Sequence, residues 1–360
     1  MHEGGTMRFI HTGDVHLGAN PESKTEWGKN RGDELWSTFE RLIKKIKVEP
    51  VDLLIIAGDL FHRQPLLREL KEVDYLFSTI PDTTVVLCAG NHDAIKKGSF
   101  YRDFKWSSNV KFLGDRDIQK VELPDLNLCI YGLSYYENEI TDPLYDHIIV
   151  DEPEKINVLV AHGGDEKHIP MNRKKMAMSG FDYVAMGHIH IPDIDEKNKM
   201  AYCGTLEPID CGDIGERGYI SGVLEKERLD LEFVPFAKRN YMELKFSIHP
   251  KMTSMELRHR LRDLIEEQGA DNMYRIQIEG YRDPDFDVFL SGIEEIGNIV
   301  SIEDLSVPDF DFQELYEGNK DNILGMFIKK HLDAEPLEAM EQKVLYYGTK
   351  ALLDAMEDKL

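Results

Sequence analysis

The sequence lacks the features of a secreted or membrane-spanning protein. It contains four cysteines in 360 residues, and none of them stands in a CxxC pair. Scattered thiols in a chain of this length favour a reducing compartment and predict a cytoplasmic location. A run of about 18 apolar residues is missing, which argues against a transmembrane helix and against a membrane partner. The polar residues 1–6 lack the apolar segment of a secretory signal, and we expect them to form a disordered extension.

Basic charge is also scarce, since the formal net charge is −24 at pH 7. This deficit alone argues against a nucleic-acid ligand, because phosphate binding is built from lysine and arginine. Two segments depart from the average: 94–111 carries a net charge of +4 and 166–175 carries +3. Either these cations are simply solvated or they contact a nucleic-acid backbone, with Lys96, Lys97, Arg102, Arg173 and Lys174 as the candidates.

Aromatic residues are interleaved with the cations of segment 94–111. They could stack on frayed bases while the cations bind phosphates, or they could belong to the core. The core interpretation is the stronger one for Phe104 and Trp106, and both interpretations stay open for Phe100 and Tyr101.

The first two thirds of the chain alternate between predicted strands and helices. Residues 7–11 form the first expected strand. Predominantly apolar runs, typical of strands buried on both faces, occur at 51–57, 84–89, 156–161 and 183–186. Apolar residues at helical spacing predict helices over 33–47, capped by Asp33, and over 67–80. Shorter strands are expected within 109–133 and 199–236, with turns at Gly204, Gly212, Gly215 and Gly218. Two packed sheets with helices outside fit this order.

The pattern changes near residue 238. Strands are expected at 241–248, 273–279 and 299–305, with helices over 253–268 and 283–292. Thr253 or Ser254 would cap the first of these helices and Gly269 would end it. We therefore predict domains over 7–237 and 238–308, followed by C-terminal helices within 309–360, at 320–332 and 336–358.

Apolar stripes on the two C-terminal helices are either core or a partner surface. The stripes comprise Ile323, Met326 and Phe327 on the first helix, and Leu337, Met340, Val344, Leu345, Leu352 and Met356 on the second.

Five short runs carry the chemistry: Asp14-Val15-His16, Gly58-Asp59, Gly90-Asn91-His92-Asp93, Ala161-His162-Gly163 and Gly187-His188-Ile189-His190. Taken singly, an aspartate after glycine is usually a turn residue and a lone histidine is usually structural. Together the runs supply seven metal-binding side chains, namely Asp14, His16, Asp59, Asn91, His162, His188 and His190. Seven ligands are too many for one four-coordinate ion. They suit two ions that share a carboxylate, an arrangement that cleaves phosphate esters.

The run Asn91-His92-Asp93 divides the work among its members. Asn91 offers a neutral oxygen ligand. His92 is expected to stay off the metals and to face the scissile phosphate as a proton donor or charge stabiliser. Asp93 is expected to orient the His92 ring and to raise its pKa. The run by itself would indicate only an Asx turn after Gly90.

The ordered set of runs resembles the calcineurin-like metallophosphoesterase superfamily. The resemblance implies a four-layer α/β/β/α sandwich with a small α/β capping domain and C-terminal helices. It assigns one ion to Asp14, His16, Asp59 and His190, and the other to Asp59, Asn91, His162 and His188, with Asp59 as the bridge. Ligands of this kind accept manganese, iron or zinc, and the resemblance favours two manganese ions.

Three details resemble the SbcD-type DNA repair exonucleases: HTGDVHLG at 11–18, GDLFH at 58–62 and GNHD at 90–93. Protein phosphatases of the superfamily usually show GDxxDRG and GNHE instead. The resemblance implies exonuclease action on DNA in double-strand break repair, with His62 positioning the substrate backbone. It also implies a homodimer and an SMC-like coiled-coil ATPase partner on the C-terminal helices. The alternatives are a phosphodiesterase for a small nucleotide or nucleotide-lipid substrate and a non-catalytic scaffold protein.

Overall fold

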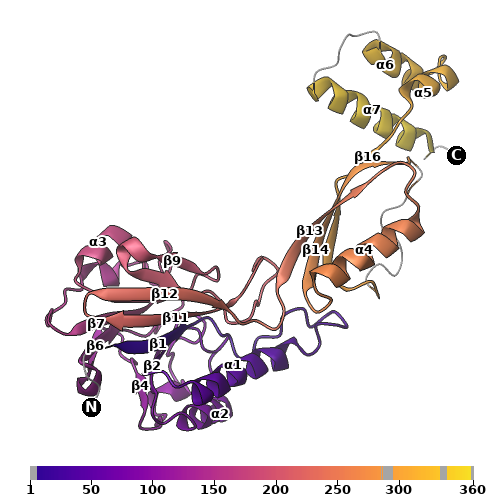
Figure 1. Cartoon of the computed structure of the whole chain (residues 1–360). Coiled ribbons are helices and arrows are strands. Elements are labelled where there is room, and N and C mark those ends of the chain that lie inside the picture. The colour runs from indigo at the N-terminus through magenta and orange to yellow at the C-terminus, as the bar shows by residue number, and fades with distance from the viewer. Residues whose placement is uncertain (1–5, 285, 287–294, 333–338, 358–360) are drawn as a thin grey trace. The chain divides into compact units, whose positions relative to one another are not determined.

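The computed structural model describes residues 6–284, 286, 295–332 and 339–357, which form two compact units (Figure 1). Unit 1 comprises Met1–Glu243 with Asp271–Tyr274, and unit 2 comprises Leu244–Ala270 with Arg275–Leu360. Residues 1–5 of the predicted extension lie outside the described residues, as does most of the predicted helix over 283–292. Unit 2 contains the C-terminal helices and most of the predicted capping domain, but residues 238–243 and 271–274 of that prediction belong to unit 1.

The first sheet of unit 1 has the strand order β12-β11-β1-β2-β3-β4. Its strands are β1 (Met7–Thr12), β2 (Leu53–Ala57), β3 (Thr84–Cys88), β4 (Val110–Phe112), β11 (Gly218–Glu225) and β12 (Arg228–Pro235). Strands β1 to β4 run parallel, and the β11–β12 hairpin pairs antiparallel with β1. The predicted turn at Gly218 is wrong, because Gly218 begins β11. A Cβ there would lie 2.0 Å from the Val234 oxygen, so close strand pairing explains the glycine.

The second sheet of unit 1 has the order β5-β6-β7-β8-β10-β9. It comprises β5 (Gln119–Leu123), β6 (Leu128–Gly132), β7 (Ile156–His162), β8 (Tyr183–Gly187), β9 (Asp193–Asp195) and β10 (Met200–Tyr202). The central strands β6, β7, β8 and β10 are parallel. The carboxyl ends of β7 and β8 therefore lie at the same edge of this sheet.

Alternating side chains of the central strands pack on both faces of the first sheet. In β2, Leu53 and Ile55 join the core between the two sheets, while Leu54 and Ile56 face the helices. The helices on that side are α1 (Arg31–Val48) and α2 (Leu67–Ser78), and α3 (Arg173–Met178) covers the outer face of the second sheet through Met176. This confirms the predicted strands buried on both faces and the α/β/β/α sandwich.

Helix α1 begins earlier than predicted, after Asn30, so the predicted cap at Asp33 is wrong. Arg31 is fully buried, and its guanidinium lies 2.7 Å from Glu34 and 3.5 Å from Glu207. Burial of the Arg31 side chain against these two carboxylates places residues 31 and 32 in the first helical turn. Asp33 then lies inside that turn, where its charge favours the helix dipole.

Most of a sheet of order β13-β14-β15 lies in unit 2, and helix α4 (Ser254–Gln268) runs alongside it (Figure 1). The strands are β13 (Tyr241–Ile248), β14 (Met273–Arg282) and β15 (Asn298–Asp304), and β16 (Val307–Pro308) pairs with β14. Helix α4 (Ser254–Gln268) begins after Thr253, whose Oγ1 accepts the Glu256 N–H at 3.2 Å. Gly269 ends it with a φ of +109°. The predicted cap and stop of this helix are confirmed.

Three helices follow in unit 2: α5 (Phe312–Gly318), α6 (Ile323–Leu332) and α7 (Ala339–Glu357). Their small core is formed by Leu324, Ile328 and Leu345, with Phe327 and Leu352 packed against it. The other members of the predicted stripes, Ile323, Met326, Met340, Val344 and Met356, are exposed, and Leu337 lies outside the described residues. Within the described part of the chain, every helix is too short or too polar to cross a membrane.

Candidate metal centre

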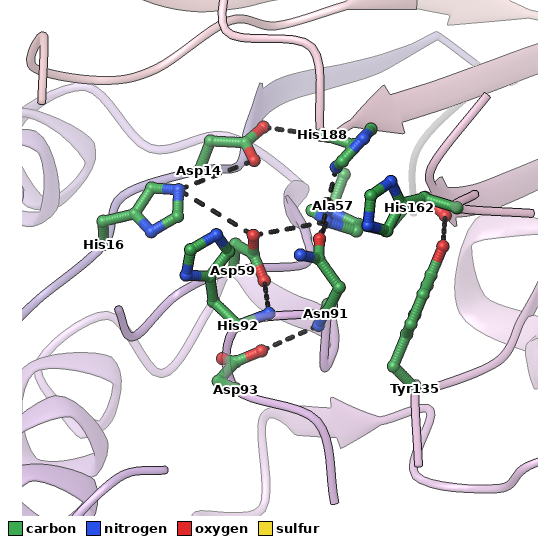
Figure 2. A network of polar contacts seen from close by, with 12 residues as sticks. Asp14, His16, Ala57, Asp59, Asn91, His92, Asp93, Tyr135, His162 and His188 are labelled. Carbon is green, nitrogen blue, oxygen red and sulfur yellow. Dashed lines mark hydrogen bonds and ion pairs between the residues drawn. The ribbon is translucent and has the colours of Figure 1, made fainter. Parts of the chain in front are cut away.

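The seven predicted metal ligands gather at the carboxyl ends of parallel strands. Figure 2 shows Asp14, His16, Asp59, Asn91, His162 and His188 side by side. Asp14 and His16 follow β1, Asp59 follows β2, and Asn91 follows β3. His162 is the last residue of β7, while His188 and His190 follow β8. Because the two sheets pack face to face, loops far apart in the sequence meet at one edge of the sandwich.

Asp59 lies at the middle of this group. Its Oδ2 is 3.8 Å from His16 Nε2 and 3.3 Å from His162 Nε2. Its Oδ1 accepts the backbone N–H of His92 at 2.9 Å. The Asp59 carboxylate thus faces ligands from both sheets at once.

Each side of Asp59 carries its own cluster. On one side, ligand atoms of Asp14, His16 and His190 all lie within 4.8 Å of one another. On the other side, Asn91 Oδ1 lies 2.9 Å from His162 Nε2 and 3.2 Å from His188 Nδ1. The backbone N–H of His188 also donates to Asp14 Oδ2 at 2.8 Å, which ties the two clusters together.

The backbone of the ligand loops is strained. Among the described residues, eight other than glycine have a positive φ, and four of these are predicted ligands: Asp14 (47°), His16 (49°), Asp59 (47°) and His188 (89°). Such conformations cost on the order of 1–3 kcal/mol each and concentrate at functional sites. Gly90 also permits a close approach, since a Cβ there would lie 2.3 Å from Asp59 Oδ1. The fold therefore tolerates strain where the ligands converge.

Burial governs the protonation of the cluster that contains Asp14 and His16. It raises the pKa of Asp14 to about 6 and lowers the pKa of His16 to about 3. For Asp59 and His162, burial opposes the charged forms, but their mutual attraction prevails. It lowers the pKa of Asp59 and raises the pKa of His162 to about 9. Burial thus disfavours the charged form of Asp14, whereas His162 stabilises the charged form of Asp59.

The site fits divalent cations. Asp14 Oδ1 and His16 Nε2 are buried atoms without a hydrogen-bond partner in the structure. Leaving such an atom unsatisfied costs about 1–3 kcal/mol, and more for a charged group. An ion at this position would satisfy both atoms, and the remaining ligands are the oxygen and imidazole donors that divalent metals accept.

His62 and His92 lie beside the ligands without belonging to the two clusters. The His92 ring is stacked on that of His62 with the centroids 5.1 Å apart, and it lies 4.8 Å from the ring of His16. His62 Nδ1 is 3.3 Å from His16 Nδ1. Both rings are exposed, so they can reach a bound substrate.

Asp93 does not have the role predicted for it. One of its oxygens accepts the Gly90 N–H at 2.7 Å, and the other accepts the Phe61 N–H at 3.2 Å and the Tyr101 hydroxyl at 2.9 Å. The prediction that Asp93 orients the His92 ring is therefore wrong, because the N–H groups of Gly90 and Phe61 and the Tyr101 hydroxyl occupy both oxygens. Asp93 instead holds the loops that carry Asp59 and Asn91.

Three ligand imidazoles have a further hydrogen-bond partner. His162 Nδ1 lies 2.9 Å from the carbonyl oxygen of Ala57, His188 Nε2 lies 2.8 Å from Asp165, and His190 Nδ1 lies 3.1 Å from Asp213. Sequence reasoning missed both aspartates. Asp165 stands three residues after His162, which is a weak signal. Asp213 is separated from His190 by 23 residues and had none.

The predicted basic contacts are distributed unevenly around the site. Lys96 lines a surface pocket together with His62, His92 and Asn91. Lys97, Arg102 and Lys174 are exposed, whereas Arg173 is paired with Asp193 at 2.8 Å and Asp195 at 3.3 Å.

The aromatic residues of segment 94–111 belong mainly to the core. Tyr101 is buried, and Phe104 and Trp106 pack against the same core, while Phe100 is exposed. This agrees with the core interpretation of Phe104 and Trp106, and it leaves Phe100 as the aromatic side chain of this segment that a base could reach.

Comparison with known proteins agrees with this geometry. The sequence profile of the calcineurin-like phosphoesterase family matches residues 7–192. The chain is 28% identical over 223 residues to the DNA double-strand break repair protein Mre11 of Halobacterium salinarum, covering 59% of this chain and 55% of that protein. It is 29% identical over 248 residues to the Mre11 protein of Haloferax volcanii, covering 64% and 53%. The chain thus spans about half the length of these two relatives.

A third relative is one component of the nuclease SbcCD of Staphylococcus saprophyticus. It is 24% identical over 276 residues, and the match covers 66% of this chain and 71% of that protein.

Proposed function

This chain belongs to the calcineurin-like phosphoesterase family, and from that premise we propose that it hydrolyses phosphodiester bonds at DNA ends. The observation that carries the proposal is the position of Asp59. Its Oδ2 lies 3.8 Å from His16 Nε2 and 3.3 Å from His162 Nε2. One carboxylate that faces both clusters is what a pair of bridged ions requires.

The proposed cofactor is a pair of manganese ions, with iron or zinc as alternatives, because the ligand set contains no thiolate. One ion would be held by Asp14, His16, Asp59 and His190, and the other by Asp59, Asn91, His162 and His188. When bound, two such ions polarise the phosphate and neutralise the charge that develops on its oxygens. The backbone strain at Asp14, His16 and Asp59 supports the proposal, because strained conformations persist where the surrounding structure holds them and are concentrated at functional sites.

His92 is proposed to give a proton to the leaving oxygen or to stabilise its charge. The carbonyl oxygen of His62 lies 3.3 Å from His92 Nδ1 and, as an acceptor, favours a proton on that nitrogen. This leaves Nε2 of the exposed ring to face the substrate. His62, stacked on His92, is proposed to position the substrate backbone.

DNA is proposed as the substrate in place of a small nucleotide or nucleotide lipid. Support comes from relatives named as a DNA double-strand break repair protein and as a nuclease. Lys96, in the pocket with His62 and His92, is the best-placed contact to a flanking phosphate. Lys97, Arg102 and Lys174 are further candidates. At Arg173 a phosphate would compete with two carboxylates.

The exposed apolar side chains of α6 and α7 are proposed to contact an SMC-like coiled-coil ATPase. Ile323, Met326 and Met340 are 67%, 68% and 72% exposed on short helices. Apolar groups at this exposure are stabilised by burial against a partner. A homodimer and a cytoplasmic location belong to the same proposal; the four cysteines are free, which agrees with a reducing compartment.

The proposal is tested by a nuclease assay on end-labelled linear duplex DNA with Mn²⁺, beside a covalently closed circle and a chelator control. We expect the protein to shorten the linear DNA only. His188→Ala should lose cleavage together with metal binding. His92→Gln should keep its Mn²⁺ affinity and lose turnover by about 100-fold or more.

Two outcomes would contradict the proposal. Cleavage of an aryl phosphodiester with linear DNA left intact would favour the small-substrate alternative. Mn²⁺ binding with no cleavage of either substrate would indicate the scaffold protein.

A further inference from the structure

The ring of His190 contacts a buried carboxylate that lies outside the predicted ligand set. Asp213 Oδ1 is 3.1 Å from His190 Nδ1, and Asp213 is 4% exposed. The other oxygen, Oδ2, accepts the backbone N–H groups of Ile209 at 2.9 Å and Asp210 at 3.1 Å. Both oxygens of Asp213 are therefore engaged, one by the loop and one by the histidine.

The segment that follows Asp213 is anchored by two backbone donors. The Gly215 N–H donates to the Tyr241 oxygen at 2.9 Å, and the Arg217 N–H donates to Asn240 Oδ1 at 3.2 Å. Arg217 is 2% exposed, and its Nη2 lies 4.0 Å from Asp213 Oδ1. These contacts keep the carboxylate from turning away from His190 or toward solvent.

We infer that Asp213 is a positioning residue that sets the orientation and the tautomer of His190. A carboxylate can only accept, so the hydrogen bond fixes the proton on Nδ1. The lone pair of Nε2 is then available to the ion that we propose for Asp14 and His16. Metal-bound histidines generally donate their second ring nitrogen in this way. The inference rests on the proposed function, because it concerns a ligand of that site.

Asp165 offers a natural comparison, because it makes the equivalent contact to His188. Its carboxylate lies 2.8 Å from His188 Nε2, but its side chain is 43% exposed and it also contacts His168 Nδ1 at 2.9 Å. Water and His168 can compensate for changes at Asp165. The Asp213 side chain is 6% exposed, so nothing replaces its acceptor. We therefore expect the Mn²⁺ affinity to depend more on Asp213 than on Asp165.

The substitution Asp213→Asn tests the inference through hydrogen-bond geometry. An asparagine at this position has one acceptor and one donor group. The N–H groups of Ile209 and Asp210 both require the acceptor, so the amide NH₂ is left facing His190. His190 Nδ1 must then accept a hydrogen bond, and the proton moves to Nε2, where it blocks the metal.

The matched control is Asp210→Asn on the same loop. Asp210 is exposed, and its Oδ1 accepts the Gly212 N–H at 2.8 Å, a bond that an asparagine oxygen preserves. This variant removes one negative charge without touching His190. Any difference in Mn²⁺ affinity between the two variants is therefore due to the lost acceptor at His190 and not to the lost charge.

The experiment is a titration of the metal-free chain with Mn²⁺, in which calorimetry measures the heat of binding. We expect Asp213→Asn to weaken Mn²⁺ binding by about 10- to 100-fold relative to Asp210→Asn. Aryl phosphodiester cleavage should need correspondingly more Mn²⁺ and return to near the parent rate at saturation. Equal affinities for the two variants would overturn the inference.

A second measurement tests the tautomer of His190 directly, without metal, and so does not depend on how well the variant binds Mn²⁺. Nitrogen NMR of histidine-labelled, metal-free chain identifies the His190 signal by its loss in His190→Ala. We expect this signal alone to change from the Nδ1–H to the Nε2–H form in Asp213→Asn. An unchanged tautomer would refute the role of Asp213. The proposed function would stand in that case, since it is tested by cleavage with the parent chain.

Discussion

Unit 1 buries polar and charged side chains, whereas unit 2 exposes apolar ones. Of the buried polar and charged side chains in the described residues, Thr349 is the one that belongs to unit 2. The exposed large apolar side chains show the opposite trend. Ten of the eighteen lie in unit 2, although it is the shorter unit.

The difference indicates two kinds of function. Burying polar groups costs free energy unless they are paired, so a cluster such as Asp14, His16 and Asp59 persists where a ligand compensates for it. Exposed apolar groups lower the free energy when a partner covers them. The comparison supports the proposals that the chemistry takes place in unit 1 and that unit 2 associates with a partner. Three substitutions can break or sharpen it.

The largest effect is expected from Asp59→Asn in unit 1. Removing the charge shared by both clusters should reduce Mn²⁺-dependent cleavage of an aryl phosphodiester by about 1,000-fold or more, because two-ion stabilisation is worth several kcal/mol. Steady-state rates across a range of Mn²⁺ concentrations measure this. Asp82→Asn, an exposed aspartate before β3, is the control and should keep the parent rate. Full activity of Asp59→Asn would contradict the proposal that the buried polar cluster of unit 1 carries the chemistry.

An intermediate effect is expected from Met326→Asp in unit 2. Met326 is 68% exposed on α6, so the charge should leave ester cleavage unchanged and weaken co-purification with the SMC-like ATPase of the same organism by about tenfold or more. Tyr75→Asp, 66% exposed on α2 of unit 1, provides a matched control that should retain binding. If both variants bind alike, the exposed apolar groups of unit 2 have no special role in association.

The smallest effect is expected from Thr253→Ala at the start of α4. Loss of the bond from the Glu256 N–H to Thr253 Oγ1 should destabilise α4 by about 1 kcal/mol. Hydrogen exchange of the α4 amides measures this loss, and Thr253→Ser, which keeps the hydroxyl, should show almost none. Cleavage by unit 1 should not change. A parallel loss of cleavage would show that the two units are not independent.

Sequence reasoning was most successful where one segment contained all the information. Residues 53–57 are apolar throughout, and β2 is buried on both faces as that pattern predicts. Thr253 and Gly269 enclose a periodic helix, and α4 begins and ends beside them. All seven predicted ligands end or follow parallel strands, so the fold brings them to one edge.

Sequence reasoning failed where an interaction joined distant segments. Asp93 was assigned to its neighbour His92, but Phe61 and Tyr101 occupy its oxygens. Asp33 was assigned as a helix cap, but buried Arg31 moves the start of α1. In both cases a contact with another part of the chain decided the outcome, because Phe61 and Tyr101 contact Asp93, and Glu207 contacts Arg31.

The sequence by itself determined the main strands, the position of the predicted ligands after them and the family, because these depend on local periodicity and on residue chemistry. Only the tertiary structure decided how the ligands are held. The contact of Asp213 with His190 spans 23 residues, and the stripes on α6 and α7 divide into buried and exposed members only once the helices pack. Contacts between distant residues follow from how the elements fold together, and no single segment encodes them.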